Sequence, residues 1–145
     1  MVQPKSKQPK RHSVGHAMIG DTLGTAIIQC NLLEEIQNLH KEDAWLRGTG
    51  PSSTTLVKHP DLRIVLLTMK KNICMHQHST AARISVQTLA GHIRLRLPDR
   101  TAELPAGQLL VLDQCVSHDV EAKEDSAFLL TLSWNGQGSD ACGTD

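Results

Sequence analysis

Aromatic side chains are almost missing from this chain of 145 residues, which has no tyrosine, one phenylalanine and two tryptophans. An aromatic fraction of 2% leaves too few rings for the stacking surfaces that bind single-stranded nucleic acid. Charge of one sign is not in excess either, because 15 Lys and Arg balance 15 Asp and Glu. The composition therefore gives no reason to expect nucleic acid or an anionic membrane as a partner.

Long apolar runs are also missing. No stretch reaches the roughly 18 residues that cross a bilayer, and the N-terminus has no apolar stretch typical of a secretion signal. The cysteines stand far apart and form no C-x-x-C pair: they are Cys30, Cys74, Cys115 and Cys142. We therefore expect reduced thiols and a soluble, cytoplasmic protein.

The chain lacks the motifs of two large enzyme classes. Ser79 and Ser117 lie near histidines, but neither stands in a Gly-x-Ser-x-Gly turn. Gly15, Gly20 and Gly24 are not followed by the Lys-Ser/Thr ending of a phosphate-binding loop. Neither a serine hydrolase nor a nucleotide-binding enzyme is expected.

Composition divides the chain into four segments. Residues 1–20 are basic and without periodicity, which predicts a disordered arm, and the Gly-, Ser- and Asp-rich residues 135–145 predict a flexible tail. Residues 21–53 contain a helix that Asn31 caps and that extends to Ala44. Its apolar face comprises Leu32, Leu33, Ile36, Leu39 and Ala44.

From residue 54 the apolar residues recur with a period of two, which is typical of β-strands. The predicted strands are 54–58, 62–70, 84–89, 93–97, 108–112, 118–122 and 127–134. The near-continuous apolar runs 62–67 and 109–112 predict strands buried on both faces, one of them covered by the helix or by a partner subunit. Residues 54–134 therefore predict an all-β domain, an antiparallel sandwich or barrel.

Three histidines stand out within this domain. His76 and His78 form a His-x-His pair, and side chains two apart on a strand point to the same face. His118 follows on another predicted strand. Imidazole is a common ligand of transition metals, so the three residues predict a divalent metal site. The alternative is a polar cavity in which the histidines are only hydrogen-bonded.

These motifs resemble those of small single-domain cupins of the RmlC-like kind. The matching positions are His76, His78 and Gly91 in the first motif and Pro105, Gly107 and His118 in the second. The resemblance implies an antiparallel jelly-roll barrel, here preceded by an N-terminal α-helix. It further implies a metal held by His76, His78 and His118, and a homodimer formed through sheet contacts.

One ligand of the family pattern is absent. Where the first motif has a glutamate, this chain has Ala82, Arg83 or Ile84, depending on the direction of counting. A neutral three-histidine set favours Zn, Fe, Ni or Cu over the harder Mn and Mg. The metal's identity stays open among these four.

Several other side chains are weighed as contacts. Arg83 is a candidate partner for a substrate carboxylate at the mouth of the barrel, and Gln87 a candidate contact inside it. The alternative for Gln87 is that Ile84 and every second residue after it point into the barrel. Gln87 would then lie on the outer face of the strand. Cys74 and Cys115 flank the motifs and are either thiolate ligands or inert thiols.

The strand around residues 93–97 presents His92, Arg94 and Arg96 on one face. We expect this face to be solvated; the alternative is that Arg94 or Arg96 pairs with a carboxylate substrate. The sequence leaves the function between a metal-dependent oxygenase or isomerase of a small polar substrate, a non-catalytic metal- or ligand-binding module, and a barrel with a vestigial site.

Overall fold

In the computed structural model two short helices precede nine strands. The structure describes residues 26–135 and Cys142, except for the side chains of Gln77 and His78. The helices are α1 (Leu32–Leu39) and α2 (Asp43–Arg47). The strands are β1 (Ser52–Lys58), β2 (Leu62–Met69), β3 (Cys74–His78), β4 (Arg83–Ala90), β5 (His92–Arg96), β6 (Thr101–Pro105), β7 (Leu109–Leu112), β8 (His118–Ala122) and β9 (Ser126–Ser133). The predicted arm 1–20 and most of the predicted tail 135–145 lie outside the described residues.

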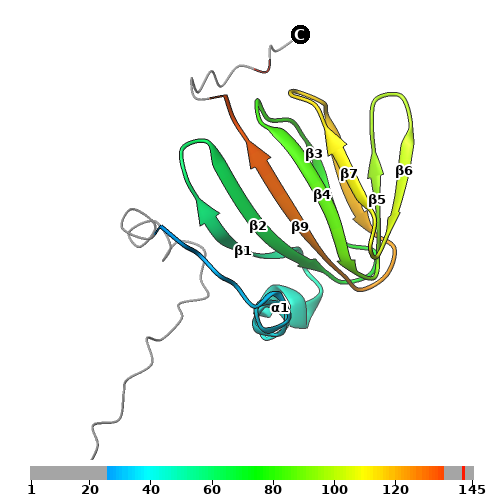
Figure 1. Cartoon of the computed structure of the whole chain (residues 1–145). Helices are drawn as coiled ribbons and strands as arrows, with labels where there is room; N and C mark the ends of the chain where they lie inside the picture. Colours follow the sequence, from blue (N-terminus) through cyan, green and yellow to red (C-terminus); the bar gives the residue numbers. More distant parts are fainter. Residues whose placement is uncertain (1–25, 136–141, 143–145) are drawn as a thin grey trace, which may run out of the picture.

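The strands form two sheets that pack face to face (Figure 1). The larger sheet has the order β1-β2-β9-β4-β7 and the smaller one the order β3-β8-β5-β6. Every pairing is antiparallel, and most neighbours in a sheet are distant in sequence, which is the jelly-roll arrangement. The prediction of an all-β antiparallel jelly roll with an N-terminal helix is confirmed.

Alternation along the strands builds two apolar layers. Leu67 of β2 packs between the sheets, in the core that also contains Ile93, Leu95 and Phe128. Leu66, its neighbour, faces the other way and packs in a second cluster that includes Leu39 of α1. Helix α1 lies beside β1 and β2 on the outer face of the larger sheet (Figure 1). Strand β2 is thus covered on both sides, as its apolar run predicts.

In β7 the helix does not cover the outer face, which leaves a partner subunit as the other predicted cover. Leu110 and Leu112 contact the core, but Leu109 and Val111 are 59% and 56% exposed. The reason is the position of β7 at the edge of the larger sheet, beyond the part of the outer face that α1 contacts. An apolar run identifies a strand, but the sheet order decides whether both of its faces are covered.

The helical segment is shorter and more broken than predicted. Asn31 caps α1 as expected, since its Oδ1 accepts from the backbone N–H of Glu34 at 3.2 Å. The helix ends at Leu39, and α2 follows after a short turn. The ring of His40, just after α1, stacks on the ring of Trp45 in α2, with the ring centroids 3.9 Å apart. Leu33 is 74% exposed, so its assignment to the apolar face is wrong.

Strands β3 and β6 fall outside the ranges predicted from the period of two. β6 ends in Pro105, which has no N–H to donate, and the fold accommodates it because β6 is an edge strand. β3 has the sequence Cys-Met-His-Gln-His and pairs with β8, and Met75 alone gives too little apolar alternation to reveal the strand.

Gly91 sits at the tight turn between β4 and β5 with a positive φ of 78°. A Cβ at this position would collide with the backbone carbonyl oxygen of Asp125 and with Ser126. Gly107 has a φ of 88° but no atom within 4 Å of an added Cβ, and Gly50 has open space as well. Gly91 is therefore required by both its backbone conformation and a close approach of the β8–β9 turn.

We predict that Gly91→Ala lowers the free energy of unfolding by about 3 kcal/mol or more, because it adds the collision to the cost of a positive φ. Gly107→Ala has only the cost of the positive φ, about 1–2 kcal/mol. Gly50→Ala serves as the control and stays within about 0.5 kcal/mol of the wild type. Urea unfolding measures all three; equal losses at Gly91 and Gly107 would contradict the proposed collision.

Candidate metal and ligand site

The pairing of β3 with β8 determines which histidines share a face. Cys74 pairs with Glu121 and Met75 with Val120, but the next registered pair is His78 with His118. One extra residue therefore stands in β3 between Met75 and His78, which is a β-bulge. A bulge resets the alternation of side chains along the strand, so residues two apart across it need not share a face.

His118 is the buried member of the set, with 3% of its surface exposed. Its Nδ1 lies 2.9 Å from the carbonyl oxygen of Val116. Since a carbonyl can only accept, Nδ1 carries the proton and Nε2 carries the lone pair. Metal-binding histidines are commonly held in this tautomer by a backbone carbonyl, and in the neutral ring of His118 it leaves Nε2 as the nitrogen able to bind a cation.

The structure does not bring His76 into the same environment. Met75 next to it packs against the core, whereas His76 is exposed, which places it on the outer side of β3. The backbone of His78 lies opposite buried His118, and its side chain is outside the described part of the molecule. Among the described side chains no three His, Cys, Asp or Glu residues are grouped to hold a metal.

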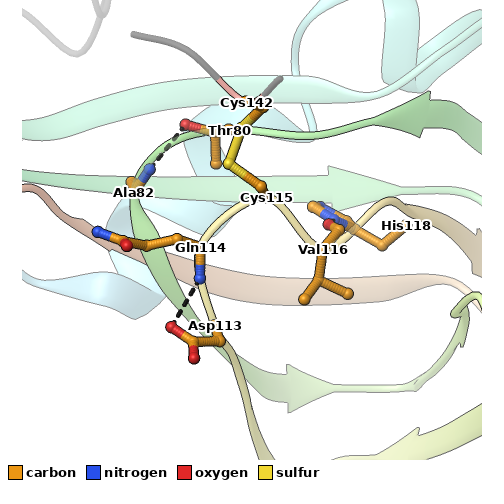
Figure 2. The surroundings of a disulfide bond; sticks show 8 residues. All are labelled: Thr80, Ala82, Asp113, Gln114, Cys115, Val116, His118 and Cys142. Carbon is orange, nitrogen blue, oxygen red and sulfur yellow. Dashed lines mark hydrogen bonds between the residues drawn. A yellow bond between two sulfur atoms is a disulfide. The ribbon is translucent and has the colours of Figure 1, made fainter. Parts of the chain in front are cut away.

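The loop that leads into His118 is fastened by a disulfide between Cys115 and Cys142 (Figure 2). The backbone N–H of Cys115 also donates to the carbonyl oxygen of Thr80 at 2.8 Å, which ties this loop to the β3–β4 connection. The expectation of reduced thiols is thus wrong for Cys115 and Cys142, and Cys115 has no thiolate to offer a metal. The expectation of a cytoplasmic location loses this part of its support.

Cys30 and Cys74 are reduced thiols. Burial, and next the charge of Asp119, raise the pKa of the Cys74 thiol above its usual value. A thiol with a raised pKa is a poor thiolate ligand at neutral pH, so Cys74 fits the inert alternative.

The two candidate substrate contacts lie on strand β4. Arg83 is exposed and its guanidinium donates to Asp113 Oδ1 at 3.2 and 3.3 Å, across to the loop that carries the disulfide. Gln87 is exposed, and buried Val86 and Thr88 on either side of it point inward. The structure therefore places Gln87 on the outer face, as the alternative interpretation has it.

The predicted charged face of β5 is observed on the outer side of the smaller sheet. His92 Nε2 lies 2.6 Å from Glu103 Oε2, and Arg94 donates to the other oxygen of Glu103. The hydrogen bond with His92, followed by that from Arg94, holds the pKa of the Glu103 carboxyl below its usual value. Arg94 is thus paired with Glu103 on the outer face of the sheet and is partly buried there.

A pocket of about 200 Å³ opens next to His118. It lies between the β5–β6 turn and the start of β8, and its walls are Arg96, Leu97, Pro98, Ser117, His118 and Asp119. The sequence alone does not join Arg96 with Asp119, because the two residues become neighbours only through the pairing of β5 with β8. Leu97 and Pro98 of the β5–β6 turn are the lining residues for which the sequence pattern gave no signal.

Comparisons with known proteins bear on the fold. No family model and no curated protein sequence matches the chain. Solved structures do match: a conserved protein of unknown function from Streptococcus pyogenes has a TM-score of 0.64 at 22% identity, covering 77% of this chain and 97% of that one. A cupin superfamily protein from Desulfitobacterium hafniense has a TM-score of 0.59 at 15% identity, covering 61% of this chain and 82% of that one.

An RmlC-like cupin from Shewanella frigidimarina is similar too, with a TM-score of 0.56 at 17% identity, covering 62% of this chain and 81% of that one. The chain has the cupin fold. The resemblance drawn from the histidine motifs is confirmed at this level. Within the described residues, no helix of this cupin barrel is long and apolar enough to span a membrane.

We predict that the denatured, unreduced protein exposes two alkylatable thiols, Cys30 and Cys74, because Cys115 and Cys142 are joined. Cys142→Ser adds Cys115 to the reactive set, and it lowers the free energy of unfolding by about 2–4 kcal/mol because the loop closure is lost. Alkylation followed by mass spectrometry counts the thiols. Cys30→Ser is the control, which removes one thiol and leaves the disulfide; four thiols without reduction would contradict the bond.

Proposed function

We propose that this protein is a small cupin that binds a divalent transition metal at the β3–β8 pair and holds a small polar molecule beside it. The observation that carries the proposal is the geometry around His118: a buried imidazole, held with its lone pair on Nε2, in register with a second histidine, His78. Opposite residues of an antiparallel pair have Cβ atoms about 4.5–5.5 Å apart, which suits two ligands of one cation.

The residues fit such a group chemically. Two imidazoles favour borderline metals, so Zn, Fe, Ni and Cu are the candidates. A bound cation would supply a Lewis acid that polarises a substrate oxygen or a water. The protein's own part is to hold His118 in one tautomer through Val116 and to keep bulk water from one side of the ring by burying it. His76, the third predicted ligand, is exposed, and we assign it no primary role.

The proposed reaction class is a metal-dependent oxygenation or isomerisation of a small polar substrate. A second candidate is a non-catalytic module that binds a metal or small ligand. The absence of the family's glutamate favours this second candidate. At the corresponding position Ile84 is in the core, and Arg83 points outward to Asp113. No carboxylate stands at this position, so a proton-transferring group is missing from it.

We predict that His78→Ala and His118→Ala each weaken binding of Zn²⁺ by more than about 100-fold, since each removes a ligand of the same ion. His76→Ala and His59→Ala, the latter in the β1–β2 turn, bind as the wild type does. Metal content is measured on protein purified without a chelating resin and again after loading with Zn²⁺, Fe²⁺, Ni²⁺ or Cu²⁺. His118→Asn provides a second variant of similar size.

Equal metal content in the wild type and both His118 variants, with folding confirmed by circular dichroism, would refute the metal site. If His76→Ala lost as much metal binding as His118→Ala, the placement of His76 outside the metal site would be wrong.

We further propose that the protein is a homodimer formed through the β7 side of the larger sheet. The support is the pair of exposed apolar side chains Leu109 and Val111 on an edge strand. Leu109→Glu with Val111→Glu is expected to convert a dimer to a monomer, because it places charges in the contact. Analytical ultracentrifugation checks this, with the exposed Leu33→Glu as control. A wild-type monomer at about 100 μM would contradict the proposal.

A further inference from the structure

The pocket beside His118 combines opposite charges with an apolar wall. Arg96 comes from the end of β5 and Asp119 from β8, and both line the pocket. Leu97 and Pro98 of the β5–β6 turn form the apolar side. Its volume of about 200 Å³ equals about seven water molecules at roughly 30 Å³ each, which is smaller than the pockets that hold drug-sized ligands.

The two charges are close but not directly hydrogen-bonded. Arg96 Nη1 lies 4.0 Å from Asp119 Oδ2, beyond hydrogen-bond distance. The other end of the guanidinium, Nη2, donates to Glu121 Oε2 at 3.1 Å. Glu121 thus pairs with one edge of Arg96, while the Nη1 edge forms only a long ion pair with Asp119, which a ligand at the mouth of the pocket could replace with a hydrogen bond to each residue.

We propose that this pocket binds a small zwitterion, a free α-amino acid with a short aliphatic side chain. Its carboxylate would accept from Arg96, its ammonium would donate to Asp119, and its side chain would lie against Leu97 and Pro98. A simple carboxylate would meet Arg96 but would face the negative charges of Asp119 and Glu121. A simple amine would meet Asp119 but would face the positive charge of Arg96. A ligand with both charges would form a favourable ion pair with each of the two residues.

The inference goes beyond the proposed metal site: His118 lines the pocket, but Arg96 and its partner Asp119 are on the outer face of the smaller sheet, whereas buried His118 faces the core. It does not require the metal for binding, since Arg96 and Asp119 belong to the protein. The two proposals can therefore be tested separately on the same preparation.

The test compares three probes that differ in one group each: L-valine, 3-methylbutanoate, which lacks the ammonium, and isobutylamine, which lacks the carboxylate. Binding to the EDTA-treated protein is followed by amide chemical shifts in NMR. We expect L-valine to bind at least about 10-fold more tightly than either of the others, as the loss of one charge-assisted contact corresponds to about one decade. Glycine, without the side chain, binds more weakly than L-valine.

Arg96→Gln and Asp119→Asn each reduce the affinity for L-valine by about 10-fold or more. Arg94→Gln is the matched control: it is on the same strand and face as Arg96, outside the pocket, and leaves the affinity unchanged. Arg96→Lys keeps the charge and retains part of the affinity, which separates loss of binding from loss of folding.

Equal affinity for all three probes, or no amide shift at residues 96, 97 and 117–119, would overturn the inference. So would binding of isobutylamine that survives Arg96→Gln while L-valine shows none, because that marks a simple cation site. If metal binding fails but L-valine binding persists in the EDTA-treated protein, only the metal proposal falls.

Discussion

The pairing of β3 with β8 is the constraint on which the candidate site depends. It aligns Met75 with Val120 and then, after one extra residue in β3, His78 with His118. That extra residue separates the environment of exposed His76 from that of buried His118. In a strand of regular period, side chains two apart share a face, whereas across a bulge they need not.

Around this pair the β7–β8 loop is held by several independent contacts. The Cys115–Cys142 disulfide joins it to Cys142 near the C-terminus (Figure 2). The hydrogen bond from the backbone N–H of Cys115 to the carbonyl oxygen of Thr80 joins it to the β3–β4 connection. Val116 then accepts from His118 within the same loop. A loop fastened in this way can hold an imidazole in one tautomer and one orientation, which a loose loop could not do. The pocket between Arg96 and Asp119 begins where this loop ends.

Much of the fold could be predicted from the sequence, because burial imposes a period on the side chains. The alternation of Ile84, Val86 and Thr88 matches their buried positions, and β2 is covered on both faces as its run of apolar residues indicates. Where burial is not the cause, the pattern gave no signal. β6 is an edge strand that ends in proline. β3 pairs with β8, but its sequence has little apolar alternation.

The sequence by itself determined the secondary-structure period, the cap of α1 at Asn31 and the histidines that make metal chemistry conceivable. These depend on near neighbours, and a chain carries that information locally. Only the tertiary structure decided that Leu109 and Val111 are exposed, that Cys115 meets Cys142, and that Arg96 faces Asp119. Each of these depends on which strands become neighbours, and in an antiparallel jelly roll most neighbours are far apart in sequence.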